Sequence, residues 1–135
     1  MKLIISFVIV LLTGTFYVQA QKSELEGRTF HIKLTLIEGK GVQGSAWTED
    51  EIIFTRGRLN PKYMGKHEQF PPAPCEIKVG EFSGKKVITF SAAHRNRGES
   101  DIKWEGTVTG NRIEGTAIWT NMHGPRTYSF TGETK

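Results

Sequence analysis

Apolar and polar residues alternate along most of the chain, and this period of two constrains the fold more than any other feature of the sequence. In the stretch RTFHIKLTLIE, Phe30, Ile32 and Leu34 fall on one face, while His31 and Lys33 fall on the other. A period of two is that of a β-strand with one face in the core and the other in water. The stretch is therefore predicted to form a half-buried strand.

Six further stretches repeat this alternation, namely DEIIFTR, CEIKVGEF, KKVITFSAA, DIKWEGTVT, NRIEGTAIWT and RTYSFTG, and RLNPKYM is a candidate for an eighth strand. Turn-forming residues, above all glycine and asparagine, separate them. Short strands joined by hairpins without a helical spacer predict an all-β fold. The expected architecture is an antiparallel up-and-down meander that closes into a small barrel of about eight strands, which leaves no exposed edge.

Two segments depart from the simple pattern. Residues 48–51 match the spacing of a helix capping box, but the stiff, β-branched Ile52 and Ile53 follow, so a strand is predicted there instead of a helix. Residues 60–74 contain four of the five prolines and form the longest irregular stretch. This segment is expected to be a loop over one mouth of the barrel.

The amino terminus, MKLIISFVIVLLTGTFYVQA, has the features of a secretory signal peptide. A lysine precedes an apolar run from Leu3 to Leu12, and Val18 and Ala20 occupy the positions that signal peptidase reads. The run is too short to cross the hydrocarbon core of a bilayer, which needs about 20 residues. Residues 1–20 are therefore predicted to be a signal peptide. Residues 21–135 are predicted to be a single β-barrel domain with no membrane span, exported to the periplasm or the medium and soluble after cleavage.

Charge and cysteine content narrow the expected partners. The formal net charge is only +4, from 18 basic and 14 acidic residues. So small an excess, without a basic cluster interleaved with aromatic residues, argues against nucleic acid as a partner. Cys75 is the only cysteine, so it cannot form a disulfide within the chain, and a small buried residue at the start of a strand is expected.

The stretch WEGTVTGNRIEGTAIW predicts a hairpin that turns at its central Gly-Asn pair. In that register Gly106 lies opposite Gly115 on the inner face, which also carries Trp104 and Trp119. Glycine inside a strand costs entropy and packing, so a pair of glycines needs a reason. One interpretation is a sharp bend with an indole lying over the glycines. The other is a small apolar cavity bordered by the indoles, with the Tyr128 hydroxyl as a further polar group. The candidate ligand-binding residues are therefore Trp104, Gly106, Gly115, Trp119 and Tyr128.

The remaining positions expected to face the interior are almost all uncharged. They are Phe30, Ile32, Leu34, Phe54, Ile77, Val79, Ile88, Phe90, Val108, Ile113, Ala117 and Phe130. A barrel of eight strands is just wide enough to be filled by side chains or to hold one small ligand. Such a ligand should be mostly apolar, because a charged molecule would find no partner inside.

No motif argues for an enzyme, a metal site or a cofactor. The histidines lack the short spacing of metal ligands and are interpreted as surface or loop residues; they are His31, His67, His94 and His123. Glu105 and Glu114 should lie diagonally opposite, about 7–8 Å apart, a separation that glycosidases also use. Both carboxylates should face water, so the pair is interpreted as part of a solvated strand face.

The motifs FTRGRL, WEGTVTGNRIEG and YSFTG resemble those of small exported bacterial β-barrels of the lipocalin and avidin type, the calycin-like barrels, which include groups with no assigned function. The resemblance covers most of the chain after residue 20. The lipocalin Gly-x-Trp signature is absent, the nearest approach being GSAW at residues 44–47, and the biotin-contacting residues of avidin are not matched. The resemblance therefore implies a barrel fold and carries over no site residue.

Two kinds of function are expected from these features. The first is an exported, non-catalytic binding module that holds a small, mostly apolar ligand in the barrel or at its mouth beneath residues 60–74. The alternative is an interaction or structural protein of the cell envelope, with a filled barrel and a working surface on its loops. The two differ in whether the interior has room for a ligand.

The exported protein is expected to begin at Gln21, because Val18 and Ala20 precede that residue at the positions recognised by signal peptidase. Intact-mass measurement of the protein recovered from the periplasm or the medium checks this. A mass that retains residues 1–20 would contradict the prediction of a soluble exported domain.

Overall fold

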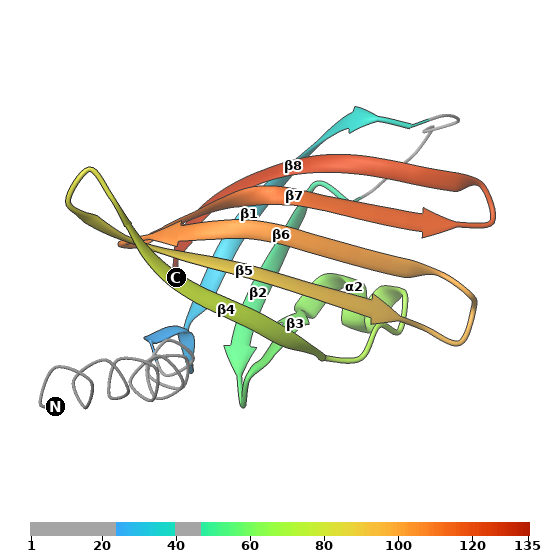
Figure 1. Cartoon of the computed structure of the whole chain (residues 1–135). Coiled ribbons are helices and arrows are strands. Elements are labelled where there is room, and N and C mark those ends of the chain that lie inside the picture. Colours follow the sequence, from blue (N-terminus) through green and yellow to red (C-terminus); the bar gives the residue numbers. More distant parts are fainter. Residues whose placement is uncertain (1–23, 40–46) are drawn as a thin grey trace, which may run out of the picture.

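The computed structural model describes residues 24–39 and 47–135 and places them in a closed barrel of eight antiparallel strands (Figure 1). Each strand pairs with the next one along the chain, and β8 returns to pair with β1. The described elements are β1 (Thr29–Glu38), β2 (Glu49–Thr55), β3 (Arg58–Pro61), α2 (Lys62–His67), β4 (Ala73–Phe82), β5 (Lys85–Arg95), β6 (Asp101–Thr109), β7 (Arg112–Asn121) and β8 (Gly124–Thr134). The predicted all-β meander is confirmed. The predicted signal peptide lies outside the described residues and stays a prediction.

The alternating apolar and polar residues of the strands face the interior and the solvent, respectively, as expected. In β1 the inward Phe30, Ile32 and Leu34 are buried, and the outward His31 and Lys33 are exposed. The buried side chains of all eight strands join in one hydrophobic cluster that contains most of the large aromatic rings. Burial of this apolar surface is the main source of stability, because the chain has no internal disulfide.

The β6–β7 hairpin has the predicted register. Thr109 pairs with Arg112 across the turn, and Gly106 pairs with Gly115 further along. Gly110 adopts a φ of 60°, which the two-residue turn of a tight hairpin requires and which glycine adopts without strain. Local turn chemistry therefore fixes which residues of both strands face the interior.

Phenyl rings occupy the space beside the paired glycines. A Cβ atom on Gly106 would lie 2.7 Å from Cζ of Phe90. One on Gly115 would clash with the carbonyl oxygen of Glu105 and lie 2.9 Å from Cζ of Phe130. The glycines therefore allow the sheet to curl tightly under two phenyl rings. The expected tight bend is present, but the rings nearest the glycines are those of Phe90 and Phe130 and not the indoles. The apolar cavity beside the indoles stays a prediction.

Residues 60–74 differ most from the expectation. The predicted eighth strand is confirmed only over Arg58–Pro61, because Lys62–His67 form the helix α2. The segment is therefore not irregular as a whole. Met64 and Phe70 are both buried and belong to the core cluster, and α2 packs against β2 and β3 (Figure 1). The segment still covers one end of the barrel, but it does so with a helix.

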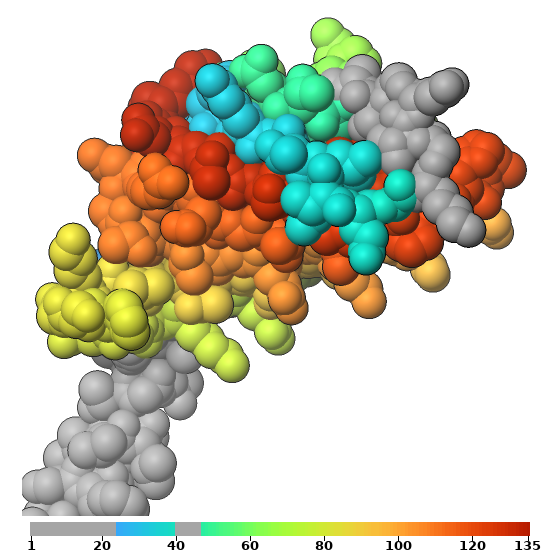
Figure 2. All heavy atoms as spheres, turned by 90° about the horizontal axis from the view of Figure 1, so that it is seen from above, coloured from blue at the N-terminus to red at the C-terminus, as the bar shows by residue number. Residues whose placement is uncertain are grey.

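The barrel closes where the first and last strands meet, and Figure 2 shows β1 and β8 side by side on the surface. Gly132 pairs with Ile32 in this seam. A Cβ atom on Gly132 would clash with the carbonyl oxygen of His31 and lie 2.8 Å from Cα of Ile32, so only glycine permits this approach. In the described part of the chain, no helix has the length and hydrophobicity needed to cross a lipid bilayer.

Replacement of Gly115 by alanine is expected to lower the free energy of unfolding by about 1–3 kcal/mol, because the added methyl group would meet backbone atoms of β6. The matched control is Gly80→Ala in β4, where a Cβ atom would meet no heavy atom within 4 Å. Urea unfolding of both variants checks this. Equal midpoints for the two variants would show that the close approach of β6 and β7 is wrong.

Candidate functional site

Three tryptophans and one tyrosine gather at one end of the barrel, which we call the aromatic end. Trp47 is 2% exposed, and the centroid of its ring lies 4.9 Å from that of Tyr128. The corresponding distances to Trp104 and Trp119 are 5.6 Å and 6.1 Å, and all three contacts are edge-to-face. The structure therefore brings together three of the five predicted site residues, around a fourth aromatic residue that the sequence did not place in the site.

The two predicted glycines lie on the same inner face but not in this cluster. Phe130, whose ring covers Gly115, lies between the two groups, with its centroid 5.4 Å from that of Trp104. Gly106 and Gly115 therefore shape the wall beneath the aromatic end, and the polar groups of a site there come from other residues.

A buried carboxylate holds the aromatic end together. Asp50 is only 4% exposed, and its Oδ1 accepts hydrogen bonds from the backbone N–H groups of Glu51 and Tyr63, both at 2.7 Å. Its Oδ2 accepts from the indole Nε1–H of Trp47 at 3.0 Å and from the backbone N–H of Met64 at 3.3 Å. Tyr63 and Met64 lie in the first turn of α2, so Asp50 satisfies amides that a capping side chain would otherwise take.

The interior thus contains charge that the sequence analysis did not expect. Burial raises the pKa of the Asp50 carboxyl above its ordinary value, while the four hydrogen bonds oppose that rise. The alternation of β2 contained the signal, because Asp50 lies two residues before Ile52 and four before Phe54, on the same inward face. Asp50 was not among the residues expected to face the interior, and acidic residues in strands usually face water.

His94 is the second buried ionisable residue, at 2% exposure, and this corrects its interpretation as a surface or loop histidine. Its Nδ1 lies 2.7 Å from the carbonyl oxygen of Pro71, so the Nδ1–H donates there and Nε2 is left as an acceptor. Burial lowers the pKa of the imidazole, which favours the neutral ring. Its ring packs between Phe70 and Trp104, with centroid distances of 6.3 Å and 6.5 Å.

Four buried nitrogen atoms around this cluster have no hydrogen-bond partner among the residues that the structure describes. They are His94 Nε2, Trp104 Nε1, Trp119 Nε1 and Arg126 Nε. The four side chains are connected: ring contacts run from His94 through Trp104 and Trp47 to Trp119, and the guanidinium of Arg126 lies 5.1 Å from the Trp119 ring.

Such atoms are costly to bury. Each unsatisfied polar group costs about 1–3 kcal/mol, and native proteins leave few of them. Four in one connected cluster offer three donors and one acceptor to a molecule bound at the aromatic end. Two of the three donors are the indole N–H groups of Trp104 and Trp119, both predicted site residues.

The other residues considered as functional candidates in the sequence give less support for a site. Cys75 is buried on β4, as expected, and its Sγ donates to the carbonyl oxygen of Glu76 at 3.9 Å. Glu105 and Glu114 are exposed on the outer face of the β6–β7 hairpin, as the solvated-face interpretation predicts. Within the described ranges, no group of three or more His, Cys, Asp or Glu side chains is arranged to hold a metal ion.

Replacement of Asp50 by asparagine is expected to lower the free energy of unfolding by about 1–3 kcal/mol. The carboxylate faces four N–H donors, so an amide nitrogen in place of one oxygen would point at donors instead of accepting from them. Urea unfolding at pH 7 checks this, with Asp101→Asn on β6 as the matched control. A variant as stable as the control would show that these hydrogen bonds do not hold the aromatic end.

Comparison with known proteins adds no relative to this geometry. No protein-family model matches the chain, and neither the curated proteins nor the solved structures include a match.

Proposed function

We propose that the protein is an exported, non-catalytic binding module of the lipocalin or avidin type that holds a small, mostly apolar ligand at the aromatic end. The observation that carries this proposal is the connected set of four buried nitrogen atoms without partners among the described residues. Export rests on the sequence of residues 1–20, and the lipocalin or avidin type rests on the resemblance of the hairpin motifs.

The chemistry of the site favours a particular kind of ligand. Its walls are indole and phenol rings, which bind apolar surface. Trp104 and Trp119 each contribute an indole N–H, which can only donate. The preferred ligand is therefore a compact apolar molecule with at least one acceptor oxygen, such as a ketone. It is small, because Phe90 and Phe130 fill the layer below.

Binding rather than catalysis is proposed because of what these groups can do. Indole N–H groups neither take up nor release protons near neutral pH, so they recognise a ligand without activating it. The Nδ1–H of His94 is committed to the carbonyl of Pro71.

Acetophenone and ethylbenzene are the matched probes for this proposal, since they have nearly the same shape and differ in one carbonyl oxygen. Acetophenone is expected to bind about 2–10-fold more tightly, the range that one hydrogen bond supplies. Quenching of tryptophan fluorescence measures both affinities. The proposal is wrong if neither probe binds, or if both bind equally well.

Two variants locate the probe. Trp104→Phe keeps an aromatic ring and deletes the N–H, so it should reduce the preference for acetophenone. Tyr63→Phe removes a polar atom from an aromatic side chain on α2, outside the cluster, and should leave the preference unchanged. An equal effect of the two substitutions would place the probe elsewhere.

The alternative of an interaction or structural protein of the cell envelope has its own support. Phenyl rings fill the layer at the paired glycines, and apolar side chains are exposed at two hairpin tips, with Phe82 at 75% and Met122 at 90% exposure. These two tips lie at opposite ends of the barrel, so each would form a separate contact point, since only grouped apolar side chains make a larger contact surface. This function would become the preferred one if neither probe binds.

A further inference from the structure

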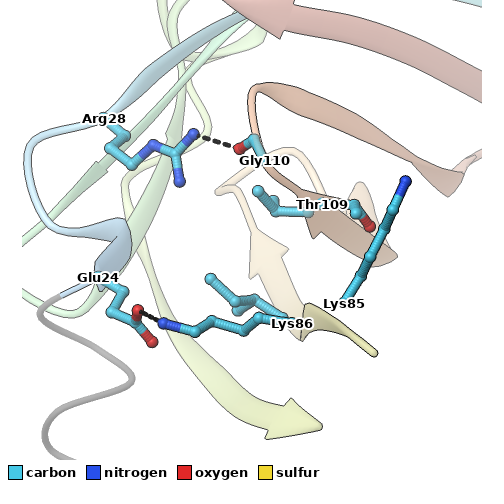
Figure 3. A pocket seen from close by; sticks show the side chains of 8 residues that line it. Glu24, Arg28, Lys85, Lys86, Thr109 and Gly110 are labelled. Carbon is cyan, nitrogen blue, oxygen red and sulfur yellow. Dashed lines mark hydrogen bonds and ion pairs between the residues drawn. The ribbon is translucent and has the colours of Figure 1, made fainter. Parts of the chain in front are cut away.

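The mouth opposite the aromatic end contains a pocket of about 690 Å³ (Figure 3). It is lined by Lys85 and Lys86 at the start of β5 and by Val108 near the end of β6. His94 lies near the other end of β5, and Trp104 lies toward the start of β6. The pocket and the aromatic end are therefore at opposite ends of the same strands. We call this pocket the cationic mouth.

The floor of the cationic mouth is apolar. Ile88 and Val108 line it, and they are only 5% and 1% exposed, so they present the top of the hydrophobic core. The volume is within the range of about 300–1,000 Å³ that is usual for small-molecule pockets. A molecule seated there would bury part of its own apolar surface against these two side chains.

The rim of the pocket carries more positive than negative charge. Three cations line it, Arg28, Lys85 and Lys86, against the single carboxylate of Glu24. Glu24 forms an ion pair with Lys86 at one side of the pocket (Figure 3). Lys85 forms no ion pair with any residue of the described ranges. The carboxylate of Glu24 thus neutralises one of the three cations, and the rim keeps a net positive charge from Arg28 and Lys85.

Arg28 is held in place, so its orientation is built into the fold. Its guanidinium lies 4.9 Å from the centre of the Phe30 ring. Its Nη2 donates to the carbonyl oxygen of Gly110 at 2.7 Å and to Oγ1 of Thr134 at 3.2 Å. Both bonds use the same nitrogen, and Figure 3 shows the other terminal nitrogen pointing into the pocket. A guanidinium fixed in this way is suited to an oxyanion, because its planar N–H groups match the geometry of a carboxylate.

We propose that the cationic mouth binds an amphipathic anion, a small molecule with an apolar body and one carboxylate or similar oxyanion. The apolar body lies on Ile88 and Val108, and the anionic group lies at the terminal nitrogen of Arg28 that points into the pocket. Lys85 adds positive charge at the rim. The ligand displaces Glu24 from Lys86 or leaves that ion pair intact at the side of the pocket. This site is separate from the aromatic end, and it does not depend on the function proposed for that end.

Octanoate and octan-1-ol test the proposal by calorimetric titration, because they share a chain length and differ in the anionic group. Octanoate is expected to bind with one-to-one stoichiometry and about fivefold or more tightly, with an affinity that falls as the salt concentration rises. The inference is overturned if octanoate shows no saturable binding, or if the alcohol binds as tightly as the carboxylate.

Two charge-neutralising variants are expected to change the affinity for octanoate in opposite directions. Lys85→Gln should weaken octanoate binding about 2–5-fold and leave octan-1-ol binding unchanged, as loss of one exposed ionic contact would. Glu24→Gln should strengthen octanoate binding by a similar factor, because it removes the competing carboxylate, and a misfolded variant could not produce that gain. Lys78→Gln, an exposed lysine of β4 that does not line the pocket, is the matched control. Weaker binding by Glu24→Gln, or equal effects of the two lysine variants, would contradict the proposal.

Trp104→Phe separates this site from the aromatic end. It should leave octanoate binding at the wild-type affinity, because Trp104 lies at the other end of the barrel. If octanoate binding responds to Trp104→Phe and not to Lys85→Gln, the anion occupies the aromatic end, and this inference fails while the proposed function stands. If acetophenone fails to bind and octanoate behaves as expected, the proposed function fails and this inference stands.

Discussion

The carboxylate of Asp50 is the interaction on which the aromatic end depends. It binds N–H groups from three parts of the chain: its own strand, the first turn of α2 and the indole of Trp47. A charge buried this deeply is tolerated in a protein only when its hydrogen bonds are satisfied. Pro61 begins the helix without any side-chain cap, so the helix has no other polar anchor at that end. The ring of Trp47, around which Trp104 and Tyr128 are arranged, is held by the same oxygen atoms.

The interior is divided into layers, so the two ends of the barrel can differ in chemistry. Phe54 contacts Phe30 and Phe90 edge-to-face in the middle, with centroid distances of 5.9 Å and 5.3 Å. Above this layer lie indoles and a buried imidazole, and below it lie Ile88, Val108 and a charged rim. Because the phenyl layer is packed, the barrel does not form a through-channel among the described residues. The polar groups of the two ends are therefore separated by packed apolar side chains.

Structural features that are determined by neighbouring residues could be predicted from the sequence, and features that depend on residues far apart in the chain could not. The register of the β6–β7 hairpin was predictable because a Gly-Asn turn sets it within a few residues. Strand alternation also contained the burial of Asp50, although its charge argued against that position. The helix α2 was not predictable, because it is only six residues long and its amides are satisfied by a residue of another strand. The cationic mouth could not be predicted either, because it also depends on residues far apart in the sequence: Arg28 and Gly110 are 82 positions apart.

The seam between β1 and β8 has a consequence for how the chain folds. Phe30 pairs with Thr134, and the backbone N–H of Lys135 donates to the carbonyl oxygen of Thr29, so β1 is completed by residues about 100 positions further along the chain. Contacts between such distant residues must overcome the entropy of closing a long loop, and proteins rich in them fold slowly, over milliseconds to seconds. While a ribosome is still making β8, β1 has an unpaired edge and the barrel stays open. The barrel closes only after β8 has been synthesised.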